Sequence, residues 1–196
     1  MALSAADSAP TRIAVFLDRD GVINRRIEGG YVRRWEEFEL IPGALQAITA
    51  LHRAGYLVLI VTNQRGVARG LVDETELSRM HGRLTEVAKR AGGQIDAVYV
   101  CPHEADTCDC RKPAPGLIWR ALADHAGVDV ERSHMVGDSM ADLEAGHSVG
   151  LQLWVVGEDH DRVRRHADRR GLETRGGAAS LAQLVENGAL TAALKS

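Results

Sequence analysis

Five short apolar runs predict the strands of this chain. They lie at residues 13–17 (IAVFL), 57–61 (LVLIV), 97–100, 134–136 and 151–156. Continuous apolar runs are typical of strands that are buried on both faces of a parallel sheet. The first run ends directly at a charged residue, so its strand is expected to lead into a loop that carries function.

Helical segments fall between these runs. Leu45, Ile48 and Leu51 recur at helical spacing in the first of them. Asp73 and Glu76 resemble a capping box at the start of the second. Helices are predicted at residues 43–54, 73–91, 115–126, 140–147 and 161–170, with a last amphipathic helix around Leu181, Leu184 and Leu190. The alternation of strands and helices predicts βαβ units with right-handed crossovers, and therefore a doubly wound, three-layer, Rossmann-like α/β fold.

Composition narrows the class of protein. The 196 residues suit one domain, which we expect at residues 12–190 between tails at 1–11 and 191–196. A net charge of -3 gives no electrostatic reason to bind nucleic acid or an anionic membrane. No apolar run approaches the roughly 20 residues that span a bilayer, and residues 1–11 lack the pattern of a signal peptide. We therefore expect a cytoplasmic protein, and the scarcity of apolar surface stripes favours a monomer.

Four separate segments deliver polar side chains to one edge of the predicted sheet. Asp18 and Asp20 follow the first run, residues 62–63 follow the second, and Asp138 follows the fourth. Residues 111–112, an Arg-Lys pair, come after a loop that leaves the third run. In open α/β sheets, ligands bind beyond the carboxyl ends of the strands. These segments are therefore expected to meet in one site.

The segment Asp18-Arg19-Asp20-Gly21-Val22 carries groups suited to phosphate chemistry. Two carboxylates two residues apart can share Mg2+, which prefers oxygen ligands and leaves room for a substrate phosphate. A carboxylate such as Asp18 can also attack phosphorus and form an acyl phosphate. Asp20 can then protonate the leaving oxygen and later accept a proton from water. Taken alone, the pattern is equally compatible with a solvated turn.

Residues on the other segments suit the binding of a phosphoryl group. Thr62 and Asn63 offer a hydroxyl, an amide and backbone N–H groups. Lys112 offers a point charge, and Arg111 can hold a phosphate through two parallel hydrogen bonds. Each of these patterns alone is more often an ordinary polar loop or surface pair. Their order along one chain is what gives them weight.

Two further carboxylates follow the fourth strand. Asp138 stands at its end and can ligate the same metal as Asp18. Asp142 lies four residues further on, in the first turn of the next predicted helix. Capping of that helix and a role in the metal site are equally compatible with its position.

A cluster of soft ligands follows the third strand. Cys101, His103, Cys108 and Cys110 form a complete Cys3His set within ten residues. Four protein ligands suit a closed, tetrahedral and structural Zn2+ site, whereas a catalytic zinc keeps an open position. Free thiols beside an incidental histidine are the alternative. The zinc would hold the loop, 101–110, that delivers the Arg-Lys pair. Histidines elsewhere, His81 and His134 among them, are expected to pack or lie on the surface.

Taken together, residues 13–156 resemble the haloacid dehalogenase superfamily of phosphatases. The resemblance rests on the DxD strand end, the Thr62 strand end, the lysine and the GDxxxD segment at 137–142, all in the family's order. It implies that Asp18 is the nucleophile and Asp20 the acid and base. It implies further that Thr62 and Lys112 stabilise the transferred phosphoryl group. Magnesium would be held by Asp18, the backbone carbonyl of Asp20, and Asp138.

Within that superfamily, the CPH…CDCRKP segment resembles two phosphatase groups with a nearly capless core. One acts on D-glycero-D-manno-heptose 1,7-bisphosphate and the other on histidinol phosphate. The segments DRDGVIN, GYV and TNQRGVARG favour the heptose group. That resemblance implies removal of the 7-phosphate, in nucleotide-heptose biosynthesis for lipopolysaccharide or surface glycans. It also implies the substrate-binding residues, which are Glu28, Gly29, Gly30, Tyr31, Thr62, Asn63, Gln64, Arg65, Arg111, Lys112 and Ser139.

The chain departs from the heptose group in two places. Only residues 104–107 separate the halves of the zinc loop, which bears on the anomer that fits, and Ser139 stands where some relatives have lysine. Histidinol phosphate remains an alternative substrate because both groups share the CPH…CDCRKP segment. A non-catalytic sugar-phosphate-binding module is an alternative of another class, because a fold alone does not prove activity.

Overall fold

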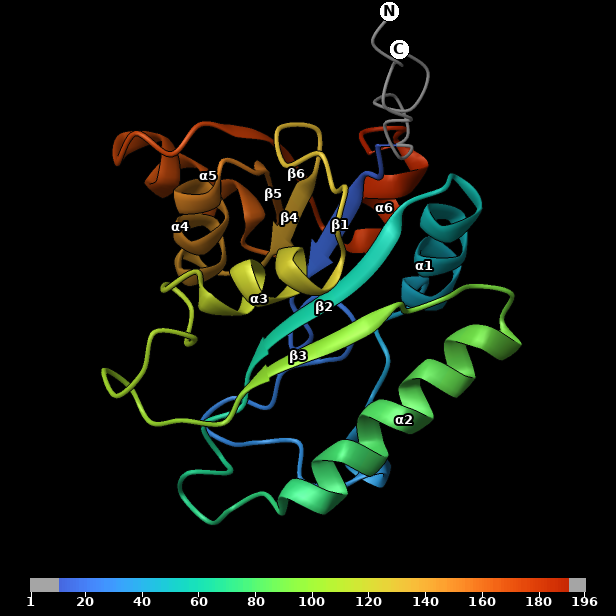
Figure 1. The fold of residues 1–196 in the computed structure, drawn as a ribbon, viewed down its shortest axis with the longest axis vertical. Helices are drawn as coiled ribbons and strands as arrows, with labels where there is room; N and C mark the ends of the chain where they lie inside the picture. The colour runs from blue at the N-terminus through green and yellow to red at the C-terminus, as the bar shows by residue number, and fades with distance from the viewer. Residues whose placement is uncertain (1–10, 191–196) are drawn as a thin grey trace, which may run out of the picture.

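A parallel sheet of six strands forms the centre of the molecule, in the order β3-β2-β1-β4-β5-β6 (Figure 1). The computed structural model describes residues 11–190, so the expected tails at 1–11 and 191–196 lie outside the described residues except for Thr11. The strands are β1 Ala14–Leu17, β2 Leu57–Asn63, β3 Ala97–Cys101, β4 His134–Gly137, β5 Gln152–Val156 and β6 Thr174–Ala178.

Helices cover both faces of the sheet, as Figure 1 shows. One face packs against α1 (Ala44–Arg53), α2 (Glu74–Arg90) and α6 (Leu181–Glu186). The other packs against α3 (Gly116–Asp124), α4 (Met140–Val149) and α5 (His160–Arg169). The arrangement is the three-layer α/β fold that the alternating pattern predicted.

The unbroken apolar character of β1 has a direct physical reason. Val15 and Leu17 belong to the core under α1, α2 and α6, whereas Ala14 and Phe16 belong to the core on the opposite face. Successive side chains of a strand point to opposite faces. A strand with a core on each side therefore needs apolar residues at every position.

The five predicted strands are confirmed, but the sequence reading missed β6. Its sequence, TRGGA, has no apolar run and contains two glycines. It lies at the edge of the sheet that residues 11–190 form, beside β5. Of its residues only Ala178 is buried, so the strand needs little apolar surface. The predicted last helix is shorter than expected, because α6 ends at Glu186 and Leu190 is buried beyond it.

The connections after the central strands create the site. β1 lies between β2 and β4, so the chain leaves neighbouring strands in different directions, which opens a crevice at their carboxyl ends. Between β1 and α1, the longest helical element is η1 (Trp35–Glu37), a single 3-10 turn, so this segment holds no cap domain.

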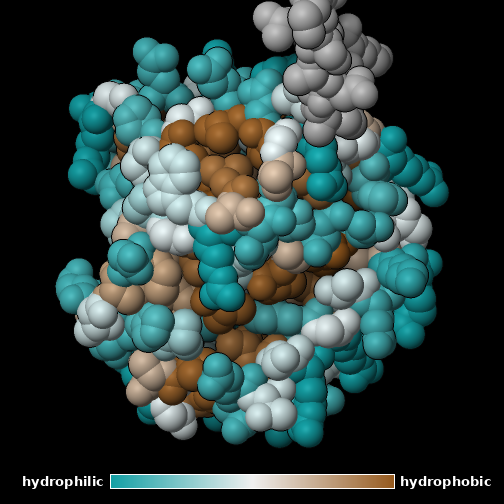
Figure 2. Space-filling view, viewed as in Figure 1, coloured by the Kyte–Doolittle hydropathy of each residue, from teal (hydrophilic) through white to brown (hydrophobic). Residues whose placement is uncertain are grey.

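The face seen in Figure 2 is largely hydrophilic, with a hydrophobic patch in the upper part of the view and further hydrophobic side chains along edge strand β3. There, Val98 and Val100 line a shallow groove beside α2. Among residues 11–190, no helix has both the length and the apolar character needed to cross a bilayer.

Candidate active site

Three carboxylates meet where β1 and β4 end. Asp18 follows β1, Asp138 follows β4, and Asp142 lies in the first turn of α4; each offers an oxygen within 4.8 Å of the others. Gly21 permits this close approach, since it has a φ of +97° and a Cβ added there would lie 1.9 Å from Asp138 Oδ2. Any larger residue at position 21 would be strained at this φ and would displace the carboxylate of Asp138.

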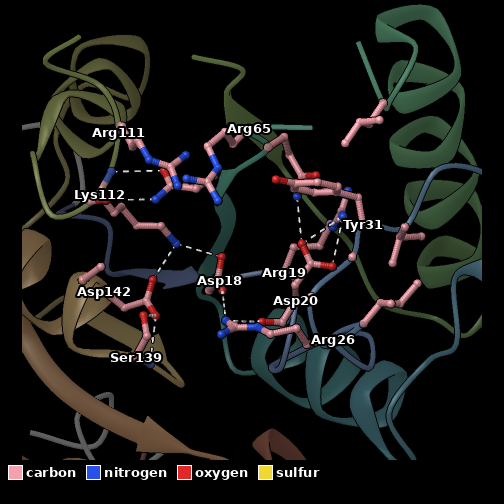
Figure 3. Close-up of a pocket in the computed structure, with 18 of the residues that line it drawn as sticks. Asp18, Arg19, Asp20, Arg26, Tyr31, Arg65, Arg111, Lys112, Ser139 and Asp142 are labelled. Atoms are coloured by element: carbon pink, nitrogen blue, oxygen red, sulfur yellow. Dashed lines mark hydrogen bonds and ion pairs between the residues drawn. The ribbon is translucent and has the colours of Figure 1, made fainter. Parts of the chain in front are cut away.

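Lys112 lies between two of these carboxylates. Its ammonium donates to Asp18 Oδ1 at 2.7 Å and to the Val61 carbonyl at 2.7 Å, and it lies 2.6 Å from Asp142 Oδ1. Figure 3 shows the lysine nitrogen between the two aspartates. All three charged side chains are almost completely buried. A buried charge is costly unless it is paired, so this triad fixes the geometry of the site.

Asp142 joins helix capping to ion pairing. Its Oδ2 accepts hydrogen bonds from the backbone N–H of Ser139 at 3.1 Å and from the Ser139 hydroxyl at 2.6 Å, which forms a capping box at the start of α4. Its Oδ1 faces Lys112. The sequence left open whether Asp142 caps the helix or belongs to the metal site, and the capping role is confirmed. Its other carboxylate oxygen, Oδ1, pairs with Lys112.

Asp20 is surrounded by hydrogen-bond donors. Arg19 donates to both of its oxygens, Asn24 donates to Oδ1 at 2.8 Å, and Gln64 donates to Oδ2 at 2.8 Å. Burial alone would raise the pKa of Asp20, but the charge of Arg19 and these hydrogen bonds together hold the pKa below its usual value. The side chain is therefore an ionised carboxylate in a fixed position.

Arg19 is fixed from behind. It is buried, donates to His81 Nε2 at 2.9 Å, and stacks its guanidinium 5.5 Å from the ring centre of Phe38. Arginine can only donate, so His81 must be neutral at Nε2. Burial, followed by the nearby charge of Arg19, lowers the pKa of His81 to about 3. The expected packing role of His81 thus serves the orientation of Arg19 and, through it, Asp20.

Two residues at the end of β2, Thr62 and Asn63, support the site. Thr62 is buried and accepts a hydrogen bond from Gln64 at 2.8 Å. Asn63 donates to the Lys112 carbonyl at 2.9 Å and accepts from the Lys112 backbone N–H at 3.1 Å. Asn63 therefore holds the backbone of the lysine, which the sequence reading did not anticipate.

A cavity of about 550 Å³ opens over the aspartates, a size in the range of small-molecule sites. Of the residues predicted to bind substrate, nine line it: Gly29, Gly30, Tyr31, Asn63, Gln64, Arg65, Arg111, Lys112 and Ser139. Thr62 and Glu28 are not part of the lining, and Thr62 lies beneath it.

The lining also includes residues that the sequence reading missed, namely Arg26, Ile27, Val32, Arg69, Leu71 and Ala141. Arg69 belongs to the TNQRGVARG segment, and Arg26 follows DRDGVIN by two residues. Their closeness to these segments was a usable signal, but only the fold shows that both face the cavity. Ile27 and Leu71 are apolar yet exposed at its edge.

The cavity wall opposite Asp20 is basic. Arg65 and Arg69 both pair with Glu104, at 3.2 Å and 2.9 Å. Arg111 lies near Arg65 in Figure 3, and its Nη1 is buried without a hydrogen-bond partner among the described residues. A buried donor without an acceptor is costly, so this nitrogen is suited to meet an anionic ligand.

Burial changes the acidity of two carboxylates. It is the largest influence on Asp18, whose pKa rises to about 6 although Lys112 opposes the rise. It also raises the pKa of Asp138 to about 7, assisted by the negative charge of Asp18 and opposed by Arg26. Such raised values mark a place where a cation would be bound with benefit.

The cysteine cluster has the dimensions of a tetrahedral metal site. Cys108 Sγ lies 3.6 Å from Cys101 Sγ and 3.4 Å from Cys110 Sγ, and His103 Nδ1 lies 3.2 Å from Cys110 Sγ. Zinc–sulfur bonds of about 2.3 Å at tetrahedral angles place sulfurs about 3.8 Å apart, whereas a disulfide requires about 2.05 Å. The four side chains therefore fit zinc and form no disulfide.

Residues 11–150 match the family of haloacid dehalogenase-like hydrolases. Among curated proteins, the D-glycero-beta-D-manno-heptose-1,7-bisphosphate 7-phosphatase of Pseudomonas aeruginosa is 43% identical over 147 residues, or 74% of this chain and 82% of the relative. The D-glycero-alpha-D-manno-heptose-1,7-bisphosphate 7-phosphatase of Mycobacterium tuberculosis is 42% identical over 145 residues, or 74% of this chain and 76% of the relative.

A solved structure is similar over almost the whole fold. It is a D,D-heptose 1,7-bisphosphate phosphatase from B. bronchiseptica in complex with magnesium and phosphate. The two chains share 36% identity and superpose with a TM-score of 0.77, covering 89% of this chain and 97% of the other.

Proposed function

The chain belongs to the haloacid dehalogenase-like hydrolase family, and on that premise we propose that it is a phosphatase that removes the 7-phosphate of D-glycero-D-manno-heptose 1,7-bisphosphate. The product would be heptose 1-phosphate. The observation that carries the proposal is the buried triad of Asp18, Lys112 and Asp142 at the floor of a cavity with a basic wall. Relatives of both anomeric specificities, at 42–43% identity, support the substrate class.

Asp18 is the proposed nucleophile. Its carboxylate oxygen attacks the phosphorus of the 7-phosphate, and the bond from phosphorus to the sugar oxygen breaks, which leaves an aspartyl phosphate. Lys112, fixed 2.7 Å from Asp18 Oδ1, stabilises the negative charge on the transferred phosphoryl group. Fixed charges aimed at the reacting group are the main contribution that such a site makes. Thr62 lies buried beneath the cavity and accepts a hydrogen bond from Gln64, so it supports the floor of the site.

Asp20 is the proposed acid and base. The departing sugar oxygen takes a proton from Asp20, and Asp20 then accepts a proton from the water that attacks the aspartyl phosphate. The bond from phosphorus to Asp18 breaks, and inorganic phosphate leaves. Because its donors hold Asp20 ionised at rest, the carboxyl must take up a proton before the first step and is ready to accept one in the second.

Mg2+ fits the donor set at the strand ends. Asp18 and Asp138 would hold it through carboxylate oxygens and Asp20 through its backbone carbonyl, all hard oxygen ligands of the kind that Mg2+ prefers. One cationic nitrogen of Arg26 already lies near all three of these oxygens. When bound, the ion would neutralise charge on the phosphoryl group and on the clustered aspartates.

Arg111 and Arg65 are proposed to bind the second phosphate of the substrate. The unpartnered Nη1 of Arg111 supports this assignment. Tyr31, Gly29, Gly30 and the other lining residues would then enclose the sugar between the two phosphates. A substrate with one phosphate leaves this wall unused, which is why a bisphosphate suits the cavity better than histidinol phosphate.

Zn2+ is the proposed occupant of the cluster formed by Cys101, His103, Cys108 and Cys110. All four ligands come from the protein, so the ion has a structural role. Cys110 is directly followed by Arg111 and Lys112. The ion would therefore fix the start of the segment that carries both cations.

A direct assay tests the proposal. Purified protein with Mg2+ should release phosphate from both anomers of heptose 1,7-bisphosphate, and NMR of the product should show that the 7-phosphate has gone. Asp18→Asn should abolish release, whereas Asp159→Asn, at an exposed aspartate before α5, should not. Faster turnover of histidinol phosphate, or full turnover by Asp18→Asn, would reject the proposal. The anomer with the higher kcat/KM defines the specificity.

The proposed working form is a cytoplasmic monomer. Its three thiols are free of disulfides, and thiols that serve as metal ligands persist in a reducing compartment. Light scattering on the purified protein tests the monomer, and fractionation of cells tests the compartment.

A further inference from the structure

Arg26 contacts the oxygen atoms that the proposed magnesium site requires. Its Nη2 lies 2.7 Å from Asp138 Oδ1, 3.1 Å from the Asp20 carbonyl and 3.9 Å from Asp18 Oδ2. In Figure 3 the guanidinium lies directly beside Asp18 and Asp20. A single cationic nitrogen thus gathers the same three oxygens that were assigned to Mg2+.

Arg26 differs from the other cations that pair with these aspartates. Arg19 and Lys112 are 1% and 2% exposed at their side chains, and packing holds them in place. The side chain of Arg26 is 50% exposed. A long side chain with this exposure can leave the carboxylates for solvent without any rearrangement of the core.

The two cations exclude each other. A guanidinium and Mg2+ that use the same oxygens would lie within a few ångströms, where like charges repel. Either cation would relieve the same repulsion, because clustered carboxylates without a cation repel one another. The ion can therefore enter only when Arg26 withdraws.

We propose that Arg26 is a displaceable internal cation that holds the metal-binding oxygens together in the metal-free protein and competes with Mg2+ for them. The inference rests on the magnesium site of the proposed function. Arg26 thereby lowers the affinity for Mg2+ and protects the metal-free site from charge repulsion.

Calorimetric titration of the zinc-containing full chain with Mg2+ tests this inference. Arg26→Met keeps much of the side-chain length without the charge and should lower the Kd for Mg2+ on the order of fivefold. The same variant should melt at a lower temperature than wild type without Mg2+ and gain more on its addition. Arg25→Met is the matched control, because Arg25 pairs with Glu39 at 2.7 Å, away from these aspartates; its Kd should equal that of wild type.

The outcomes distinguish failure of the proposed magnesium site from failure of the proposed competition by Arg26. Asp138→Asn should weaken Mg2+ binding strongly; if it does not, or if wild type binds no Mg2+, the metal site itself is wrong. If Asp138→Asn weakens binding but Arg26→Met matches or falls below the wild-type affinity, the site stands and the competition is rejected. Arg26→Gln, read in the same titration, replaces the methionine variant if that protein does not fold.

Discussion

The carboxylate site and the cysteine cluster both gather side chains that could hold a metal ion, but the chain builds them in opposite ways. The carboxylates of Asp18, Asp138 and Asp142 come from the ends of two strands and the start of a helix. The cysteine cluster lies within residues 101–110 of one loop. Asp18 and Asp142 are buried and Asp138 is half-buried, whereas the cysteine cluster includes an exposed histidine, His103.

This difference determines what each site depends on. The carboxylate site exists only after β1 and β4 have paired, and its charges are held by the packed core around them. The cluster needs little core, because binding of a metal ion can itself supply the free energy that orders the loop. Substitutions in the carboxylate site are therefore expected to disturb catalysis. Substitutions in the cysteine cluster are expected to disturb the wall of the cavity.

The two sites meet at the segment that runs from Cys110 to Lys112. Lys112 is held by contacts within the carboxylate site and by Asn63, independently of the cysteines. Arg111 has no such support at its Nη1, and Glu104, in the cysteine loop, positions Arg65 and Arg69. The cysteine loop at residues 101–110 should thus affect substrate binding more than the chemical step.

Among substitutions that spare both proposed reacting aspartates, the largest expected effect comes from Lys112→Met. Loss of the ammonium removes the fixed charge beside Asp18, the proposed nucleophile, so kcat should fall about 100- to 1000-fold. It also leaves Asp18 and Asp142 buried without their partner, so the melting temperature should fall as well. Steady-state phosphate release and thermal melts monitored by circular dichroism measure both. Lys89→Met, at an exposed lysine of α2, is the control; a kcat within threefold of wild type for Lys112→Met would refute the role.

A smaller effect is expected from Cys108→Ser, which removes one ligand of the cluster. The bound zinc should be lost, and kcat/KM should fall on the order of tenfold, mostly through KM because Asn63 still holds Lys112. Metal analysis and steady-state kinetics test this together. A loss confined to kcat would show that the loop acts on the chemistry directly, and unchanged zinc content would show that the cluster is not the zinc site.

The smallest effect concerns His134, a buried histidine outside the carboxylate site and the cysteine cluster. His134 accepts a hydrogen bond from Trp154, and burial, with the charge of Arg175, lowers its pKa from 6.5 to about 4. The unfolded chain therefore takes up a proton first as the pH falls below 6.5. The free energy of unfolding should fall by up to about 1.4 kcal/mol per pH unit between 6.5 and 4, relative to a variant without this histidine.

Urea unfolding of wild type and His134→Asn from pH 7 to pH 4 checks this expectation. The difference between the two curves isolates the histidine from the titration of the aspartates. A difference that stays constant with pH would mean that His134 is not a buried neutral group. A difference that changes with pH as expected would show that acid sensitivity also arises outside the carboxylate site and the cysteine cluster.

Particular elements explain how far the fold could be predicted. The strands at β1 and β2 were visible because a core on each face requires apolar residues at every position. β6 was invisible because an edge strand with two glycines has no such requirement. α6 was overextended because Leu190 is buried from a turn, and burial alone does not distinguish a turn from a helix.

The sequence by itself determined the fold class, the order of the segments that form the candidate active site and the Cys3His set, since these follow from local patterns and short spacings. Tertiary structure decided that Asp142 both caps α4 and pairs with Lys112, that Thr62 lies beneath the cavity, and that Arg26 reaches the oxygens proposed to hold Mg2+. The reason is distance along the chain: Arg26 and Asp138 are 112 residues apart. No local pattern encodes a contact that exists only because two parallel strands end side by side.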